Sequence, residues 1–266
     1  MTGRMKKKRE IVALALLPLI YLYIMKLPPF FFLLLLLFIS GAAQMEFYSM
    51  YGVKRSLGIT GASAGCLLLY SVYAGWEDFS LLLVLIFLAF VLLRLFDREA
   101  GPGHALADIA PVVVGLFYIP LILSLQIAIR KAGPEWIIFI GATVWASDSF
   151  AYYIGKNFGR RKLYPSVSPK KTVEGALGSM AGGALAGLLT KLLLIDGISI
   201  RQILVVGFFI GCIAVLGDLT ESMFKRDSGV KDSSSLIPGH GGVLDKIDGM
   251  LYVTPVVYIV VRFLVR

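Results

Sequence analysis

The chain has 266 residues, of which 58% are hydrophobic and only 16% are charged, and its mean hydropathy is +0.81. Soluble domains contain roughly 45–50% apolar and 25% charged residues, so this composition predicts an integral membrane protein with little room for an aqueous domain. The formal charge of +9 is typical of the cytoplasmic loops of such a protein, and the apolar content argues against a nucleic-acid partner.

Apolar runs separated by short polar segments indicate about nine transmembrane helices, because about 20 apolar residues cross a bilayer. Residues 1–10 form a basic head, and the apolar run 11–25 follows it. No small-residue cleavage site comes after this run, so we interpret it as a retained span and not as a signal peptide. The predicted spans cover residues 11–25, 30–47, 59–74, 80–96, 105–129, 136–155, 173–194, 201–224 and 245–265. The sequence thus predicts an all-α protein, with five spans in residues 1–135 and four in residues 136–266.

Lysine and arginine are distributed unevenly between the two sides of this arrangement. With the N-terminus in the cytoplasm, 19 of the 26 Lys and Arg residues fall on the cytoplasmic side. Because cytoplasmic loops carry the excess of positive charge, this orientation is favoured. We therefore expect a multi-pass protein of the cytoplasmic (inner) membrane, with the basic segments 156–171 and 225–244 facing the cytoplasm.

The longest polar segment of the second half, residues 222–248, combines cations, carboxylates and glycines. Carboxylates can hold a hard divalent cation, whereas cations and glycine-flanked N–H groups can bind phosphate oxygens. The two cysteines, Cys66 and Cys212, lie alone in apolar runs, so we expect neither a disulfide nor a zinc site. The sequence predicts a polar cleft for metal and phosphate at the cytoplasmic side of the membrane.

Paired acidic residues flank this segment. Asp245 and Asp248 are three residues apart and would share one face of the first turn of the last helix, and Asp218 and Glu221 repeat this spacing before the segment. Acidic residues in a first turn are also ordinary partners of the helix dipole. Ionisable groups within spans are costly and by default functional, however, so Asp218 and Asp148 are candidate site residues.

The run PGHGG precedes the predicted last helix. It reads either as a flexible turn or as a backbone nest in which Gly241 and Gly242 favour an anion. A phosphate monoester has a second pKa of about 6 and needs no base to become a nucleophile. We therefore interpret His240 as a hydrogen-bond donor to phosphate.

The run SPKKTVEG, residues 168–175, has the pattern of a helix N-terminus capped by Thr172. Lys170 and Lys171 would reach phosphate oxygens of a nucleotide or a lipid headgroup. The alternative is a plain basic cytoplasmic loop.

Segment 222–248 resembles the signature of the phosphatidate cytidylyltransferases, also called CDP-diacylglycerol synthases. The residues that match this signature in register are Ser222, Phe224, Lys225, Arg226, Lys231, Asp232, Ser234, Ile237, Pro238, His240, Gly241, Gly242, Val243, Asp245, Ile247 and Asp248. The resemblance extends upstream to Asp148 and covers roughly residues 140–250. Lys246 stands where the family has Arg, so an ammonium group replaces the planar guanidinium group that can form two parallel hydrogen bonds.

The resemblance implies a nucleotidyltransferase of phospholipid biosynthesis that converts CTP and phosphatidate to CDP-diacylglycerol and pyrophosphate. Mg²⁺ would be held by Asp218, Asp245 and Asp248, and a second, monovalent cation and a homo-oligomer are both compatible with it. The residues expected to act in catalysis are Asp218, Lys225, Arg226, His240, Asp245 and Asp248. Those expected to bind substrate are Asp148, Lys170, Lys171, Ser222, Lys231, Asp232, Gly241, Gly242 and Lys246.

Two other functions remain as alternatives. A CDP-alcohol phosphatidyltransferase handles a related lipid, but its DGxxAR pattern is absent from this sequence. A cation-coupled transporter would suit Asp148 and Asp218 within spans, although neither an internal repeat nor a pair of broken helices is visible.

The predicted orientation can be tested by cysteine labelling. Single cysteines placed in segments 156–171 and 225–244 should react with an impermeant reagent only when the cytoplasmic side is exposed, because both carry the positive charge that stays inside. Labelling of both segments from outside in intact cells would reverse the orientation.

Overall fold

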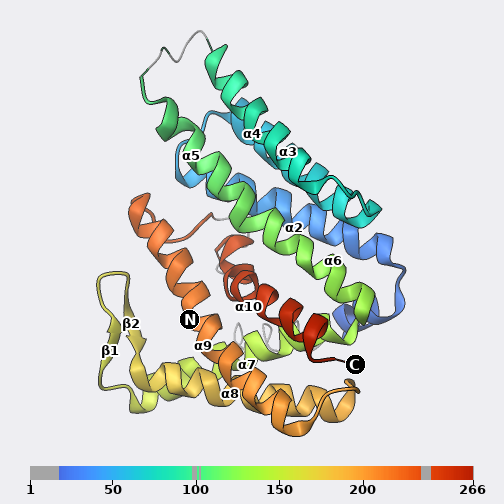
Figure 1. Ribbon diagram of the computed structural model, residues 1–266. Coiled ribbons are helices and arrows are strands. Elements are labelled where there is room, and N and C mark those ends of the chain that lie inside the picture. Colours follow the sequence, from blue (N-terminus) through green and yellow to red (C-terminus); the bar gives the residue numbers. More distant parts are fainter. Residues whose placement is uncertain (1–17, 98–100, 102, 235–240, 266) are drawn as a thin grey trace.

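The computed structural model describes residues 18–97, 101, 103–234 and 241–265, and these are almost entirely helical (Figure 1). Residues 18–26 are helical, and the helices that follow are α2 Pro29–Met50, α3 Arg55–Ala74, α4 Phe79–Leu95, α5 Ala105–Leu116, the π-helical turn η1 Phe117–Leu121, α6 Ile122–Ala132, α7 Glu135–Phe158, α8 Val173–Leu193, α9 Ile200–Asp227 and α10 Leu244–Phe263. Most of them begin or end within a few residues of the predicted spans.

Six helical segments of the described chain are long and apolar enough to cross a membrane. These segments are Pro29–Met50, Arg55–Ala74, Ala105–Ala132, Glu135–Phe158, Val173–Leu193 and Ile200–Asp227. The third unites α5, η1 and α6, and the π-helical turn at Pro120 lets the helix continue through a residue that cannot donate a hydrogen bond. Helix α4 is apolar but shorter, and most of the predicted first span, 11–25, lies outside the described residues.

The prediction of an all-α protein missed one small sheet. Strands β1 Lys162–Tyr164 and β2 Ser168–Thr172 pair antiparallel between α7 and α8, with Lys162 opposite Thr172 and an irregularity before Tyr164 (Figure 1). The strands are short and basic, and they lack the apolar alternation by which a strand is recognised in a sequence. A β-hairpin therefore lies directly before α8 in the basic segment between α7 and α8.

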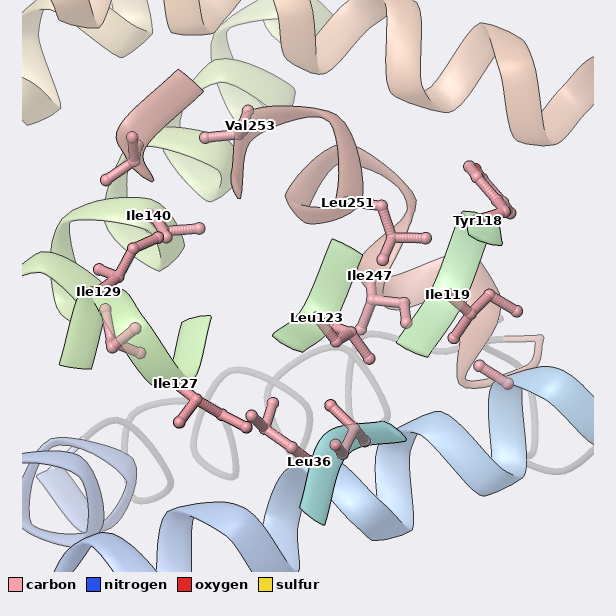
Figure 2. Packing of buried hydrophobic residues seen from close by; sticks show 14 of the residues in the cluster. Leu36, Tyr118, Ile119, Leu123, Ile127, Ile129, Ile140, Ile247, Leu251 and Val253 are labelled. Carbon is pink, nitrogen blue, oxygen red and sulfur yellow. The ribbon is translucent and has the colours of Figure 1, made fainter. Parts of the chain in front are cut away.

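Helix α10 joins two groups of helices. Figure 1 shows α2 to α6 on one side and α7 to α9 on the other, and α10 contacts helices of both groups. The buried cluster unites Ile247 and Leu251 of α10 with Leu123 of α6 and Leu36 of α2 (Figure 2). The start of α10, with Ile247 in its first turns, is thereby fixed within this core. The division at residue 135 stays a prediction.

Helix α8 packs very closely against α7 and α9 through small residues, as its glycine and alanine spacing predicts. A Cβ atom on Gly183 would meet the carbonyl of Gly207 on α9, and one on Gly211 would meet the carbonyl of Ser179 on α8. The Ser147 hydroxyl donates to the Ser179 carbonyl at 3.1 Å, and the Ser179 hydroxyl donates to the Gly211 carbonyl at 2.8 Å. Hydrogen bonds from serine hydroxyls to backbone carbonyls thus replace bulky apolar contacts at this interface.

We expect Gly211→Ala to lower the free energy of unfolding by about 1–3 kcal/mol, because backbone atoms of α8 must move to admit the methyl group. Gly41→Ala in α2 is the matched control, since a Cβ there meets nothing within 4 Å and alanine favours the helix. Thermal unfolding in detergent measures both variants, and equal effects would contradict the close approach.

Candidate functional site

Three carboxylates from two helices converge near the cytoplasmic end that we predicted for α9. One oxygen from each of Asp218, Glu221 and Asp248 lies within 4.8 Å of the other two. Gly217 allows this approach, because a Cβ there would lie 2.7 Å from the carbonyl oxygen of Asp248. We call Asp218, Glu221 and Asp248 the carboxylate cluster.

The carboxylate cluster fits a hard divalent cation. Like charges this close repel one another, and a cation among them removes the repulsion. Glu221 is 1% exposed, and within the described chain its Oε1 atom has no hydrogen-bond partner. An orphaned, buried carboxylate oxygen beside two other carboxylates is the type of ligand that Mg²⁺ takes. The sequence predicted Asp218 and Asp248 as ligands but did not assign Glu221.

Asp245, the third predicted ligand, has its oxygens engaged by the protein. Its Oδ1 accepts from Lys225 Nζ at 2.6 Å, and its Oδ2 accepts from the Gly242 N–H at 2.7 Å and the Ser233 hydroxyl at 2.8 Å. Lys225 also donates to Glu221 Oε2 at 2.6 Å. The ammonium group therefore bridges Asp245 and the carboxylate cluster, and metal ligation by Asp245 itself stays a prediction.

The two predicted nest glycines lie against the same aspartate. Gly241 has a φ of +85°, which glycine adopts without a steric cost, and a Cβ there would meet the Asp245 carboxylate. Since the Gly242 N–H already donates to Asp245, this amide is directed at the protein's own anion. His240 lies outside the described residues.

A cavity of about 420 Å³ opens beside the carboxylate cluster, within the size range of roughly 300–1,000 Å³ that is usual for ligand pockets. Residues from α7, the hairpin, α8 and α9 line it, and its charged members are Asp148, Lys156, Lys170, Lys171 and Asp218. We call it the lysine cavity. Asp218 belongs to both the lysine cavity and the carboxylate cluster, so an anion site and a cation site share one wall.

Lys171 is held in place within this cavity. Its Nζ lies 2.7 Å from Asp218 Oδ2 and donates to the Val215 carbonyl at 3.3 Å. The predicted cap is present, because the Gly175 N–H donates to the Thr172 hydroxyl at 3.1 Å and starts α8 next to Lys171. The run SPKKTVEG thus places its lysines at the cavity through a strand and a capped helix.

The remaining predicted residues lie around this centre. The buried Ser222 hydroxyl is 3.3 Å from Asp218 Oδ1, and Arg226 donates to the carbonyls of Val167 at 3.4 Å and Val230 at 3.1 Å. Arg226 thereby ties the end of α9 to the hairpin turn. Arg226 is exposed to solvent, as are Lys231, Asp232 and Lys246.

The sequence analysis missed two residues that connect the first helices to the site. Glu46 of α2 is 7% exposed and accepts hydrogen bonds from the start of α10. The Tyr51 hydroxyl donates to Asp227 Oδ2 at 2.9 Å, and burial together with this carboxylate raises the pKa of Tyr51 to about 12, so the hydroxyl keeps its proton. The signal for Glu46 was a single acidic residue at the end of an apolar run.

The apolar helices define a multi-pass membrane protein in which three carboxylates that could hold a metal ion adjoin a cavity lined by lysines. The model of the cytidylyltransferase family matches residues 7–264, and the chain belongs to this family. The match includes the first spans, which carry no signature residue.

Individual relatives support the same assignment. The phosphatidate cytidylyltransferase of Thermotoga maritima is 36% identical over 206 residues, which cover 74% of this chain and 76% of the relative. The enzyme of that name from Staphylococcus saprophyticus is 31% identical over 81% of this chain and 80% of its own length. The phosphatidate cytidylyltransferase of Bacillus subtilis is 36% identical over 57% of each chain.

We expect Glu221→Gln and Asp245→Asn to separate metal binding from stability. Glu221→Gln removes the charge of the orphaned oxygen, so Mg²⁺ affinity, measured by calorimetry in detergent, should fall by roughly tenfold or more. Asp245→Asn breaks the ion pair with Lys225 and should cost about 1–3 kcal/mol of stability in thermal unfolding. The opposite result would make Asp245 the ligand: Glu221→Gln would bind Mg²⁺ normally, whereas Asp245→Asn would stay stable but no longer bind Mg²⁺.

Proposed function

We propose that the chain is a Mg²⁺-dependent nucleotidyltransferase that converts CTP and phosphatidate to CDP-diacylglycerol and pyrophosphate in phospholipid biosynthesis. The observation that carries this proposal is the shared wall at Asp218, where the lysine cavity meets the carboxylate cluster. Transfer between two phosphate groups requires both kinds of site next to each other. The family and the names of the relatives indicate which nucleotide and which lipid are involved.

The reaction needs little covalent help from the protein. A phosphate oxygen of phosphatidate forms a bond to the α-phosphorus of CTP, and the bond from this phosphorus to the oxygen that bridges it to the β-phosphorus breaks, releasing pyrophosphate. Since the second pKa of a phosphate monoester is about 6, the attacking oxygen is already ionised at neutral pH. The protein's task is to bring two anions together and to offset their repulsion.

The lysine cavity supplies the positive charge for this task. Lys156, Lys170 and Lys171 line it and can donate to phosphate oxygens, and the contacts of Lys171 to Asp218 and Val215 fix its position. Positioned ammonium groups orient the two substrates and stabilise charge that develops on the phosphate oxygens.

Asp218, Glu221 and Asp248 would hold Mg²⁺, with the Glu221 Oε1 atom as a ligand. When bound, the ion neutralises the nucleotide phosphates and the departing pyrophosphate. Lys225 remains with Asp245 and Glu221 Oε2, and it offsets the remaining negative charge of the site. A second, monovalent cation is compatible with this arrangement.

The setting that we propose is the cytoplasmic (inner) membrane, with about nine spans, a cytoplasmic N-terminus and a site open to the cytoplasm. The distribution of Lys and Arg supports this orientation, and CTP is available on that side. Phosphatidate would reach the site from the leaflet, because its acyl chains can stay in lipid while its headgroup enters a polar cleft. A homo-oligomer is compatible with this setting. Membership of the cytidylyltransferase family argues against the two alternatives, a CDP-alcohol phosphatidyltransferase and a cation-coupled transporter.

The test is a reaction of purified protein with labelled CTP, phosphatidate and Mg²⁺, which should yield CDP-diacylglycerol and pyrophosphate in equal amounts. Lys171→Gln should lower kcat/KM by roughly 10–100-fold, because it removes a cavity donor. Lys191→Gln is the matched control, since this lysine lies in the last turn of α8 and donates to the Ile195 carbonyl. No transfer from CTP by the wild-type protein would refute the proposal, and turnover of CDP-diacylglycerol with an alcohol would favour the phosphatidyltransferase.

A further inference from the structure

Glu46 in α2 is a buried carboxylate whose two oxygens both accept hydrogen bonds from the far end of the chain. Its Oε1 accepts from the Ser234 hydroxyl at 2.7 Å and the Val243 N–H at 2.9 Å. Its Oε2 accepts from the Leu244 N–H at 2.9 Å and lies 3.2 Å from the Ser233 hydroxyl. One residue of α2 thereby contacts both residues 233–234 and the start of α10.

These contacts replace a cap that α10 lacks. The first N–H groups of a helix have no partner within the helix and are usually satisfied by the side chain of the N-cap residue. Val243 occupies that position in α10, and its side chain makes no capping bond. The carboxylate of Glu46 accepts from the first amides instead, and its negative charge also favours the positive end of the helix dipole.

The contacts continue from Glu46 into the carboxylate cluster. The Ser233 hydroxyl lies 3.2 Å from Glu46 Oε2 and donates to Asp245 Oδ2 at 2.8 Å. Asp245 Oδ1 accepts from Lys225 at 2.6 Å, and Lys225 donates to Glu221 Oε2 at the same distance. The position of the Glu221 carboxylate thus depends on Lys225, which depends on Asp245 and on the segment that Glu46 holds.

Gly242 shows how closely this region is packed. A Cβ atom on Gly242 would meet both the Ser233 hydroxyl and the Glu46 carboxylate. The space between α2 and the start of α10 therefore has no room for a side chain. A carboxylate in this position sets the distance between the two elements.

We propose that Glu46 is a positioning residue for cytidylyl transfer, which fixes segment 233–234 and the start of α10 so that Asp245 holds Lys225 against Glu221. This inference rests on the proposed function for its consequence in catalysis. It gives α2, which contributes no residue to the lysine cavity or to the carboxylate cluster, a defined role in the site.

Hydrogen exchange tests the structural half of the proposal in protein without metal or substrate. Glu46→Ala should raise amide exchange in residues 241–248 by about tenfold or more, because the first amides of α10 lose their acceptor. Gln44→Ala is the matched control: Gln44 is buried in the same helix but donates to the Tyr48 hydroxyl at 2.8 Å and the Gly61 carbonyl at 3.2 Å. It should leave exchange in 241–248 unchanged. A uniform rise throughout the Glu46→Ala protein, or none in 241–248, would overturn the proposal.

Kinetics test the catalytic half. Glu46→Ala should lower kcat by roughly 10–100-fold, whereas KM for CTP should change by less than about threefold because the lysine cavity is untouched. Glu46→Asp keeps the charge on a shorter side chain and should recover part of kcat, and Glu46→Gln should recover less. Gln44→Ala should keep kcat within about twofold even if it lowers thermal stability.

Normal kcat in Glu46→Ala, together with faster exchange in 241–248, would reduce Glu46 to a stabilising residue and refute its role in positioning. If the wild-type protein transfers no cytidylyl group, the proposed function fails. The exchange measurement still decides whether Glu46 holds the start of α10.

Discussion

The site depends on one ammonium group placed between two carboxylates. Lys225 Nζ lies 2.6 Å from Glu221 Oε2 on its own helix and 2.6 Å from Asp245 Oδ1 on α10, and its side chain is 11% exposed. Charges taken out of water cost several kcal/mol each unless close partners compensate them. Because the partners come from two helices, α9 and α10 must stand at a fixed distance for the pair to form. That distance also brings Asp248 to Glu221.

Two kinds of carboxylate follow from this arrangement. Glu46 and Asp245 are surrounded by donors of the protein, namely hydroxyls, backbone amides and Lys225. Glu221 has one buried oxygen without a partner in the described chain, and its carboxylate clusters with those of Asp218 and Asp248. The first kind holds the polypeptide, and the second kind carries negative charge that could hold a metal ion. Acidic residues that look alike in the sequence thus differ in their partners.

Close helix packing makes the neighbouring lysine cavity possible. Small residues let α8 lie against both α7 and α9, and the capped start of α8 and the hairpin then present Lys170 and Lys171 to the cavity wall. Asp218 forms an ion pair with Lys171 and also lies within 4.8 Å of Glu221 and Asp248 in the carboxylate cluster. A phosphate bound by the lysines would therefore lie next to a cation bound by the carboxylates, which is the geometry that phosphoryl-type transfer requires.

The sequence by itself determined the features that depend on local pattern: the apolar helices, the Thr172 cap, the small-residue face of α8 and the grouping of polar residues in 222–248. Spacing along a helix shows which residues share a face, because the helical period is fixed. Only the tertiary structure decided that Asp245 pairs with Lys225, that Glu221 Oε1 has no hydrogen-bond partner among the described residues and that Glu46 caps α10. These outcomes depend on which atoms meet when distant helices pack, and Glu46 lies almost 200 residues from its partners, beyond the reach of any local pattern.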